Sequence, residues 1–310
     1  MKIAITGANS SVGKTLLRTV AASHDIEAIA GVRSLQALNS CFSQTTHITP
    51  AEINYADSNH MGQQFQGVDS VIHLAGILIE GPNGTYRSAN VEATAAVVKA
   101  AQVAGAQHLV FISVIGADAS SGNAYLRSKG LAEKLVLESG LAATVLRTPI
   151  LLGHGTAGTS GILGTALQPS AKLLGGGRHT LQPLDVRDLC AVILHSCRQH
   201  LPEQGQADEQ AQSQRQTVFE VVGPEAITYR ELIRRVAEMK GIKIKLGSVP
   251  VWLAKLGTII RSRVRGGGFT PTIIDVITQD EIVAHNDAST LGVKLTPLNA
   301  TLHAMLKDSE

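Results

Sequence analysis

The sequence has little of what marks secreted or metal-binding proteins. It contains only three cysteines, Cys41, Cys190 and Cys197, and the last two are seven residues apart, which places both on one face of a helix. Cysteines in such positions are more often inert core residues than a disulfide or a metal pair. The eleven histidines show no metal-ligand spacing. We therefore expect no metal site and a reducing compartment.

Long apolar runs and a strong charge of one sign are also absent. No apolar run reaches the roughly 18 residues that cross a bilayer. The first residues, MKIAITG, already have the pattern of a buried strand, which leaves no room for a signal peptide. A net charge of +2, with no basic stripe interleaved with aromatics, argues against a nucleic-acid partner. The sequence predicts a cytoplasmic protein whose partner is a small molecule.

Strand-like and helical segments alternate through the first half of the chain. The β-rich runs lie at residues 2–6, 27–32, 70–74, 108–112 and 144–146. This alternation predicts the α/β class, with a doubly wound parallel sheet of the Rossmann type. We expect the sheet domain to cover 1–153, with 181–199 and 216–223 returning to it. A smaller, mostly helical lobe would consist of 224–310 together with 154–180.

The second half carries fewer diagnostic patterns. A strand-like run at 218–222 is expected to join the sheet. Helical patterns lie at 228–240, 250–264, 271–278 and 297–307. The Gln-rich stretch 198–217 predicts an exposed loop to which we assign no function. The glycine runs at 175–177 and 266–268 predict mobile loops.

A glycine-punctuated turn follows the first strand, from Thr6 to Thr15. Small residues there let backbone N–H groups approach a phosphate at the N-terminus of the next helix. The turn fits two templates. Lys14 and Thr15 suit a loose P-loop, whereas Gly7 and Gly13 suit the first and third glycines of a dinucleotide loop. A P-loop enzyme also needs a magnesium-binding Asp at the end of a strand, and no such Asp is evident.

The end of the second strand, at Arg33, is where a dinucleotide-binding protein selects its cofactor. An acidic residue there accepts hydrogen bonds from a free ribose 2′-hydroxyl, whereas a guanidinium pairs with a 2′-phosphate. Arg33 therefore favours NADP, with NAD as the alternative.

A second set of polar residues follows the strand at 108–112. Tyr125 and Lys129 are four residues apart in a helix-prone stretch, so they share one helix face. An ammonium near a phenol lowers its pKa, which would let Tyr125 exchange a proton with a carbonyl or alcohol. Ser113 ends the preceding strand, twelve residues before Tyr125, where its hydroxyl can hold a substrate oxygen.

With these motifs the chain resembles the short-chain dehydrogenase/reductase superfamily, and more closely its atypical branch, which includes the nucleotide-binding accessory subunit of respiratory complex I. The resemblance implies a catalytic set of Asn90, Ser113, Tyr125 and Lys129, with Asn90 supporting a water relay to Lys129. It implies cofactor contacts at Gly7, Asn9, Ser10, Ser11, Val12, Gly13, Arg33, Asn54, Leu74, Ala75, Gly76, Lys129, Pro149 and Ile150. Among these, Ala75 and Gly76 would line the adenosine and ribose, and Pro149 with Ile150 would border the carboxamide. The family often has Asp in place of Asn54 and glycine in place of Ser10.

Two functions remain open at this stage. The first is an NADP-dependent oxidoreductase, or an epimerase or dehydratase that uses the same residues, acting on a carbonyl or alcohol of a small or apolar substrate. The second is a non-catalytic NADPH-binding accessory or sensor protein of a respiratory or quinone-related assembly. The basic amphipathic stretch 243–265 would then contact a membrane or a protein complex, although the sequence favours a core helix with a solvated charged face there. A P-loop NTPase is the remote alternative, and the sequence leaves the oligomeric state open.

Overall fold

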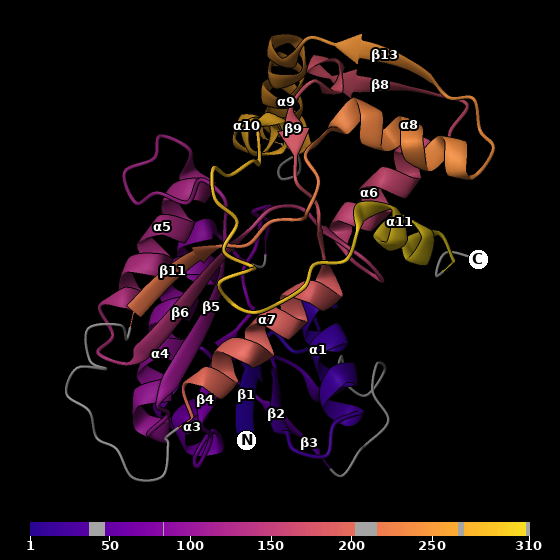
Figure 1. The fold of residues 1–310 in the computed structure, drawn as a ribbon. Coiled ribbons are helices and arrows are strands. Elements are labelled where there is room, and N and C mark those ends of the chain that lie inside the picture. The colour runs from indigo at the N-terminus through magenta and orange to yellow at the C-terminus, as the bar shows by residue number, and fades with distance from the viewer. Residues whose placement is uncertain (37–46, 83, 202–215, 266–269, 308–310) are drawn as a thin grey trace.

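A seven-stranded parallel sheet forms the centre of the molecule (Figure 1). The computed structural model describes residues 1–36, 47–82, 84–201, 216–265 and 270–307, and of residues 259–265 the backbone alone. The sheet has the order β11-β6-β5-β4-β1-β2-β3. Its strands are β1 (Lys2–Thr6), β2 (Glu27–Val32), β3 (Ile48–Glu52), β4 (Ser70–His73), β5 (His108–Val114), β6 (Ala142–Thr148) and β11 (Gln216–Glu220).

The order of the strands identifies where a ligand would bind. Chain order reverses between β1 and β4, and in doubly wound sheets ligands bind outside the carboxyl ends of the strands at such a point. The order β3-β2-β1-β4-β5-β6 is that of dinucleotide-binding folds, which favours this interpretation over the P-loop. β11 adds a seventh strand by pairing in parallel with β6, two residues earlier than the sequence pattern indicated.

Helices cover both faces of the sheet. Leucines of α1 (Ser11–Ala21) and α7 (Val186–Gln199) are buried against one face. The other face packs against α3 (Ser58–Gln64), α4 (Ala93–Ala104) and α5 (Ala124–Leu137) through apolar side chains such as Met61, Val97 and Ala132. The expected doubly wound architecture is therefore confirmed.

A smaller lobe has a core of its own. It is built from α6 (Ala157–Ala166), α8 (Tyr229–Met239) and α11 (Leu298–Lys307). Three pairs of short strands, absent from our expectations, frame these helices. They are β7 (Leu151–Leu152) with β10 (Leu184–Asp185), β9 (Thr180–Leu181) with β12 (Ile227–Thr228), and β8 (Ser170–Leu174) with β13 (Lys245–Val249).

The remaining two helices lie at one end of this lobe. α9 (Val251–Arg265) and α10 (Pro271–Thr278) begin and end within one residue of the sequence prediction. The prediction that the stretch 243–265 forms a core helix is wrong for the start of α9, because the side chains of Trp252, Leu253 and Leu256 are exposed. No helix among the described residues is both long and apolar enough to cross a bilayer.

Two further expectations concern loops and cysteines. Gly175–Gly177 form a tight 3-10 turn, η2, rather than an open loop, since Gly176 and Gly177 are buried. All three glycines have positive φ, which a side chain would strain. Cys190 and Cys197 are buried and free on α7, as expected. Cys41, the glycines at 266–268 and residues 202–215 of the Gln-rich stretch lie outside the described residues.

Candidate active site

The turn after β1 is shaped by two glycines that no other residue could replace. Gly7 has φ +73°, and a Cβ there would lie 3.0 Å from the backbone N of Ala75. A Cβ on Gly13 would lie 2.5 Å from the carbonyl oxygen of Ala8. Ser10 caps α1, because its Oγ accepts a hydrogen bond of 3.1 Å from the Gly13 N–H. This capping explains a serine where dinucleotide loops often have glycine. The turn brings Asn9, Ser11 and Val12 to the start of α1, where a phosphate would bind.

The segment after β4 lies directly against this turn. The N–H of Leu74 donates to the carbonyl of Thr6 at 3.1 Å, and Ala75 contacts Gly7 as described. A Cβ on Gly76 would lie 3.1 Å from Oδ1 of Asn90. The structure therefore brings residues 74–76, of which Ala75 and Gly76 are expected to border the adenosine and ribose, to the reversal point of the sheet.

Arg33 and Asn54 flank the same edge of the sheet beyond β2 and β3. Arg33 is exposed, and Asn54 accepts a hydrogen bond of 3.0 Å from the Ala56 N–H in a local turn. Between them lies Tyr55, which we did not single out from the sequence. Burial raises the pKa of Tyr55, while a hydrogen bond with Thr6 and the charge of Arg33 oppose that shift. Tyr55 therefore lies near both Arg33 and Thr6 at the end of β1.

Asn90 is held inside a π-helix, η1 (Arg87–Glu92), that runs directly into α4. Its Oδ1 accepts from the Ile77 N–H at 2.8 Å, and its Nδ2 donates to the Ile77 carbonyl at 3.1 Å and to Ser128 Oγ at 2.9 Å. Ser128 donates in turn to the Tyr125 carbonyl at 2.7 Å. Asn90 thus connects the loop after β4 to the helix that carries Tyr125. π-Helical turns inside α-helices are frequent at functional sites.

A buried histidine, His73 at the end of β4, forms a further polar network with residues of β1 and α4. Thr6 Oγ1 lies 2.7 Å from His73 Nδ1, and Thr94 Oγ1 lies 3.0 Å from His73 Nε2. Burial, assisted by the charge of Lys129, lowers the pKa of His73 to about 3. The ring is therefore neutral at physiological pH and serves as a fixed connector between β1 and α4.

Ser113 has a buried hydroxyl without a partner. Among the described residues, no group forms a hydrogen bond with Ser113 Oγ, although the side chain is inaccessible to solvent. Leaving a buried hydroxyl unsatisfied costs about 1–3 kcal/mol, so such groups in native proteins usually have a ligand or a functional reason. Ser113 lies on β5, one residue before Val114, which packs against the cluster around Tyr125.

Tyr125 occupies the first turn of α5, whose start is fixed by Asn123. The Oδ1 of Asn123 accepts hydrogen bonds from the N–H groups of Tyr125 and Leu126. The Tyr125 ring is buried, with its centroid 5.7 Å from that of Tyr86. Burial and, next, the charge of Glu281 raise the pKa of the Tyr125 hydroxyl. This is the reverse of the lowering that the sequence suggested.

The reason for this reversal is the position of Lys129. Its Nζ donates to the Ile112 carbonyl at 2.7 Å and lies 4.2 Å from the centroid of the Phe111 ring. Burial lowers the pKa of Lys129 to about 7, with Glu133 opposing the shift. The amine is thus directed at the backbone of β5 and carries only part of a positive charge at neutral pH. Tyr125 gains no stabilisation of its ionised form from it.

The shifted pKa of Lys129 predicts a pH-dependent stability. Folding moves this pKa from 10.5 to about 7, so between these values the unfolded chain binds a proton that the native protein lacks. Wild-type stability therefore rises with pH across that window. Lys129→Met lacks this titration. The difference in the free energy of unfolding, variant minus wild type, is therefore highest below pH 7 and declines toward pH 10.5. Urea unfolding across the window measures the slope. Lys99→Met, which removes an exposed lysine, should show no such slope.

Glu281 is a half-buried acid of the site that sequence analysis missed. Its Oε2 accepts a hydrogen bond of 2.8 Å from the N–H of Ile150, next to Pro149. Burial raises the pKa of Glu281 to about 7, with the hydrogen bond opposing the shift. Glu281 therefore meets the catalytic set at the position expected to border a nicotinamide carboxamide. A lone glutamate after α10 has no sequence pattern that could reveal this.

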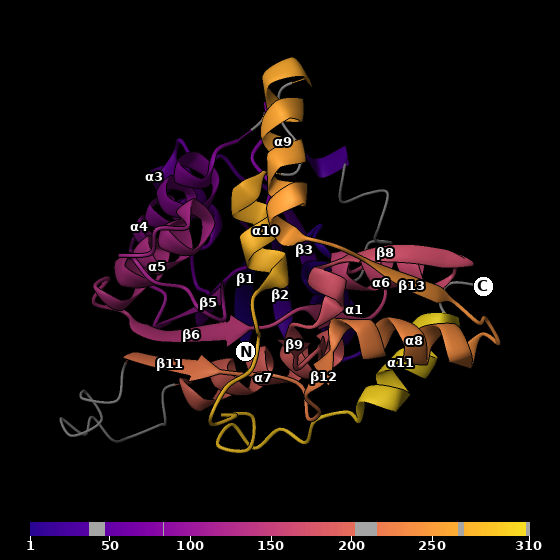
Figure 2. The ribbon, with the colours of Figure 1, turned by 90° about the horizontal axis from the view of Figure 1, so that it is seen from above.

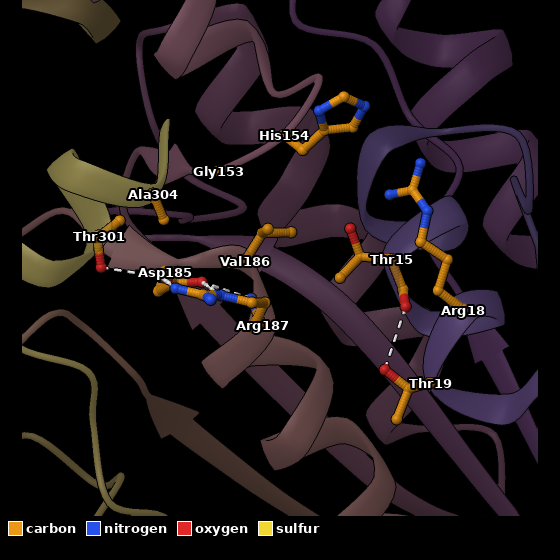
Figure 3. A pocket seen from close by; sticks show the side chains of 10 residues that line it. All are labelled: Thr15, Arg18, Thr19, Gly153, His154, Asp185, Val186, Arg187, Thr301 and Ala304. Atoms are coloured by element: carbon orange, nitrogen blue, oxygen red, sulfur yellow. Dashed lines mark hydrogen bonds and ion pairs between the residues drawn. The ribbon is translucent and has the colours of Figure 1, made fainter. Parts of the chain in front are cut away.

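A cavity of about 540 Å³ among the described residues lies away from the catalytic set (Figure 3). Its wall consists of Thr15, Arg18, Thr19, Gly153, His154, Asp185, Val186, Arg187, Thr301 and Ala304. Of the residues singled out from the sequence, Thr15 of the P-loop alternative lines it, and none of the expected catalytic or dinucleotide contacts does. Asp185 is already bonded to Arg187 and to Thr301, so the cavity's buried acid is satisfied. Among the described residues, no cluster of metal-ligating side chains is present either.

The sheet order and the turn after β1 define a Rossmann-type, dinucleotide-binding protein of the short-chain dehydrogenase/reductase kind. The profile of the NAD(P)H-binding family matches residues 7–174, and the chain belongs to this family.

Two curated relatives have distinct functions. The chain is 26% identical over 200 residues to the mitochondrial NADH dehydrogenase [ubiquinone] 1 alpha subcomplex subunit 9 of Arabidopsis thaliana, covering 62% of this chain and 46% of that protein. It is 24% identical over 185 residues to a ceramide reductase of Caulobacter vibrioides, covering 60% of this chain and 54% of the relative. The chain thus spans about half the length of the curated relatives it matches.

Solved structures share the fold across the whole chain. MoeE5 in complex with UDP-glucose and NAD superposes with a TM-score of 0.73 at 17% identity, covering 100% of this chain and 98% of that chain. The Bordetella bronchiseptica enzyme WbmG in complex with NAD gives a TM-score of 0.72 at 16% identity, covering 99% and 93%. These likenesses establish the fold, which recurs in oxidoreductases, epimerases and dehydratases that use NAD(P).

Proposed function

We propose that the chain is an NADP-dependent enzyme of the short-chain dehydrogenase/reductase type that acts on a carbonyl or alcohol, with Tyr125 as general acid and base. The observation that carries this proposal is the buried, unpartnered hydroxyl of Ser113 at the carboxyl end of β5. A substrate oxygen that accepts a hydrogen bond from Ser113 would satisfy it. The net reaction could be a reduction, an oxidation, an epimerisation or a dehydration, because all four use this set of residues.

The residues present fit a nicotinamide dinucleotide. Gly7 permits the tight turn and Gly13 the close packing of α1 on it, and together they set the N-terminus of α1 where a pyrophosphate would bind. Arg33 would pair with a 2′-phosphate. Ala75 and Gly76 would border the adenosine and ribose, and Pro149 with Ile150 would border the nicotinamide carboxamide. When bound, the dinucleotide supplies or accepts the hydride.

The side chains of this protein would handle the proton. Because burial raises its pKa, Tyr125 is protonated at neutral pH and can donate its proton to a carbonyl oxygen that Ser113 holds. In the opposite direction Tyr125 must take a proton from an alcohol, and a shift of Lys129 from the Ile112 carbonyl toward the phenol would assist it. Asn90 would support a water relay that returns the proton through Lys129.

Cofactor preference supplies a direct test of Arg33. Arg33→Gln removes the guanidinium that would pair with the 2′-phosphate, and a hydrogen bond to a charged group contributes about 1.5–3 kcal/mol. We expect the Kd for NADPH to rise about 10- to 100-fold, with the Kd for NADH unchanged. Isothermal titration calorimetry measures both. Arg18→Gln, at another exposed arginine, is the matched control. An unchanged ratio of the two affinities would contradict the assignment of NADP.

A second candidate function has support of its own. The match to a complex I subunit, together with the raised pKa of Tyr125, favours a non-catalytic NADPH-binding accessory or sensor protein. The two candidates separate in one experiment. The protein is incubated with NADPH and aldehydes, long-chain ketones or nucleotide-sugar ketones, and with NADP⁺ and the corresponding alcohols. The absorbance of NADPH is followed, and chromatography of the products detects an epimerisation or dehydration that leaves the cofactor unchanged. Turnover on any of them supports the enzyme, whereas tight NADPH binding without turnover supports the accessory protein.

A further inference from the structure

The first two turns of α9 expose an apolar surface that the fold does not cover. The side chains of Trp252, Leu253 and Leu256 are 68%, 46% and 48% exposed. On a helix these positions lie on one side, because 252 and 256 are one turn apart and 253 is adjacent. An ion pair between Lys255 of α9 and Asp275 of α10 connects the two helices. Large exposed side chains gathered on one helix mark an interaction site.

The strand that leads into α9 presents a basic face. Lys243 and Lys245 are exposed, while Ile242, Ile244 and Leu246, which alternate with them, pack on the core of the smaller lobe. Lys172 of β8 joins the exposed side, because it is the partner of Gly247 on β13 and its Cγ lies 3.3 Å from the position of a Cβ there. Figure 1 places α9, β8 and β13 at the same end of the molecule, and Figure 2 looks onto that end.

The charge of this region stands apart from the rest of the chain. Residues 239–274 contain seven Lys and Arg and no Asp or Glu. Since the whole chain carries +2, these seven leave a formal −5 for all other residues. This stretch of sequence, which includes the exposed apolar side chains of α9, therefore carries an excess of positive charge.

We propose that this face docks on an anionic lipid surface. It is formed by Trp252, Leu253 and Leu256 of α9, by Lys172 and Lys245 of the β8–β13 pair, and by Lys243 just before β13. Tryptophan and leucine enter the boundary between headgroups and acyl chains, and lysines attract anionic headgroups from beside them. The proposal does not depend on the proposed enzymatic function, because no residue of the catalytic set takes part.

Lipid explains the face better than two other occupants. A nucleic acid would use the lysines but would leave the leucines in water, since its backbone offers them no apolar contact. A second copy of the chain, related by a twofold axis, would bring the same lysines against themselves. An anionic bilayer is complementary to both components.

Trp252 is the only tryptophan of the chain, so the unmodified protein reports its own docking. The protein is mixed with vesicles of phosphatidylcholine and phosphatidylglycerol in equal parts, or of phosphatidylcholine alone. With the anionic vesicles we expect a blue shift of tryptophan emission and co-sedimentation of the protein, both weakened by added salt. Brominated acyl chains should quench the emission. An unchanged emission and a supernatant that retains the protein would overturn the proposal, and so would equal binding to both vesicles.

Variants separate the two components of the face. Leu253→Glu with Leu256→Glu should abolish co-sedimentation, whereas Leu131→Glu, at a leucine 39% exposed on α5, should bind as wild type.

Lys243→Glu with Lys245→Glu should weaken binding at least about tenfold. Lys99→Glu with Lys134→Glu changes the net charge equally on α4 and α5 and should have little effect. If Lys99→Glu with Lys134→Glu weakened vesicle binding as much as Lys243→Glu with Lys245→Glu, net charge alone would explain the binding, and the assignment of the face would be overturned. A Trp252 shift caused by double-stranded DNA, or by raising the protein concentration alone, would assign the face to those occupants instead.

Discussion

Tyr125→Phe is expected to lower kcat about 100- to 10,000-fold on any carbonyl substrate found for the protein, the range that a positioned proton donor contributes. The variant keeps the buried ring and loses only the hydroxyl. Packing of the ring against Tyr86 and Val276 is therefore retained. NADPH should bind with unchanged affinity, since the turn after β1 is not altered. Steady-state kinetics and calorimetric titration measure the two effects.

The matched control removes a hydroxyl from the neighbouring ring. Tyr86 donates to the Leu78 carbonyl at 2.9 Å, so Tyr86→Phe should cost about 1 kcal/mol of stability and leave most of kcat. Equal loss of activity in the two variants would assign the effect to the shape of the aromatic cluster. Full activity in Tyr125→Phe would remove Tyr125 from the proton-transfer step.

Arg147→Met is expected to cost about 3–5 kcal/mol of stability, because it leaves the carboxylate of Glu133 buried and unpaired. Arg147 on β6 donates to Glu133 on α5 through Nε at 3.0 Å and Nη2 at 2.7 Å. The Glu133 side chain is only 5% exposed. Arg147 also donates to the Ala117 carbonyl at 3.1 Å and so fixes the loop that follows Ser113. Urea unfolding followed by circular dichroism measures the loss.

Replacing both partners tests the cause. Arg147→Met combined with Glu133→Leu removes the unpaired charge, so much of the lost stability should return. Arg234→Met breaks the exposed pair of Arg234 with Glu231 and should cost less than about 1 kcal/mol. A double variant as unstable as Arg147→Met alone would show that packing, rather than the buried charge, is responsible.

The sequence predicted those parts of the fold whose hydrophobic period is long enough to detect. β1, β2 and the four C-terminal helices lie within two residues of their predicted bounds. β7, β9, β10 and β12 have two residues each, too few for any period. β3 is not among the predicted strands, since Pro50 interrupts its apolar pattern. The exposure of Trp252 was not visible either, because an apolar helix face looks the same whether a core or solvent meets it.

At the candidate site, sequence spacing placed residues on common elements but could not reveal burial. The four-residue spacing of Tyr125 and Lys129 suggested an electrostatic pair. The pKa of Tyr125 depends instead on desolvation and on Glu281, which is 156 positions later in the chain. Likewise, Ser10 departs from the usual glycine because it caps α1, a role that only the hydrogen bond to Gly13 shows.

The interleaving of segments in the core beneath the sheet limits how the chain could be divided. Side chains from α7, from Val221 and from Ala288 and Leu291 fill the same apolar cluster as β1 and α1. A fragment trimmed to residues 7–174, the stretch that matches the family profile, would lack β1, α7 and the C-terminal residues of this cluster, so that α1 would be the one helix left on this face of its sheet. Such a fragment should aggregate rather than fold, so expression trials and two-hybrid baits need the full-length polypeptide.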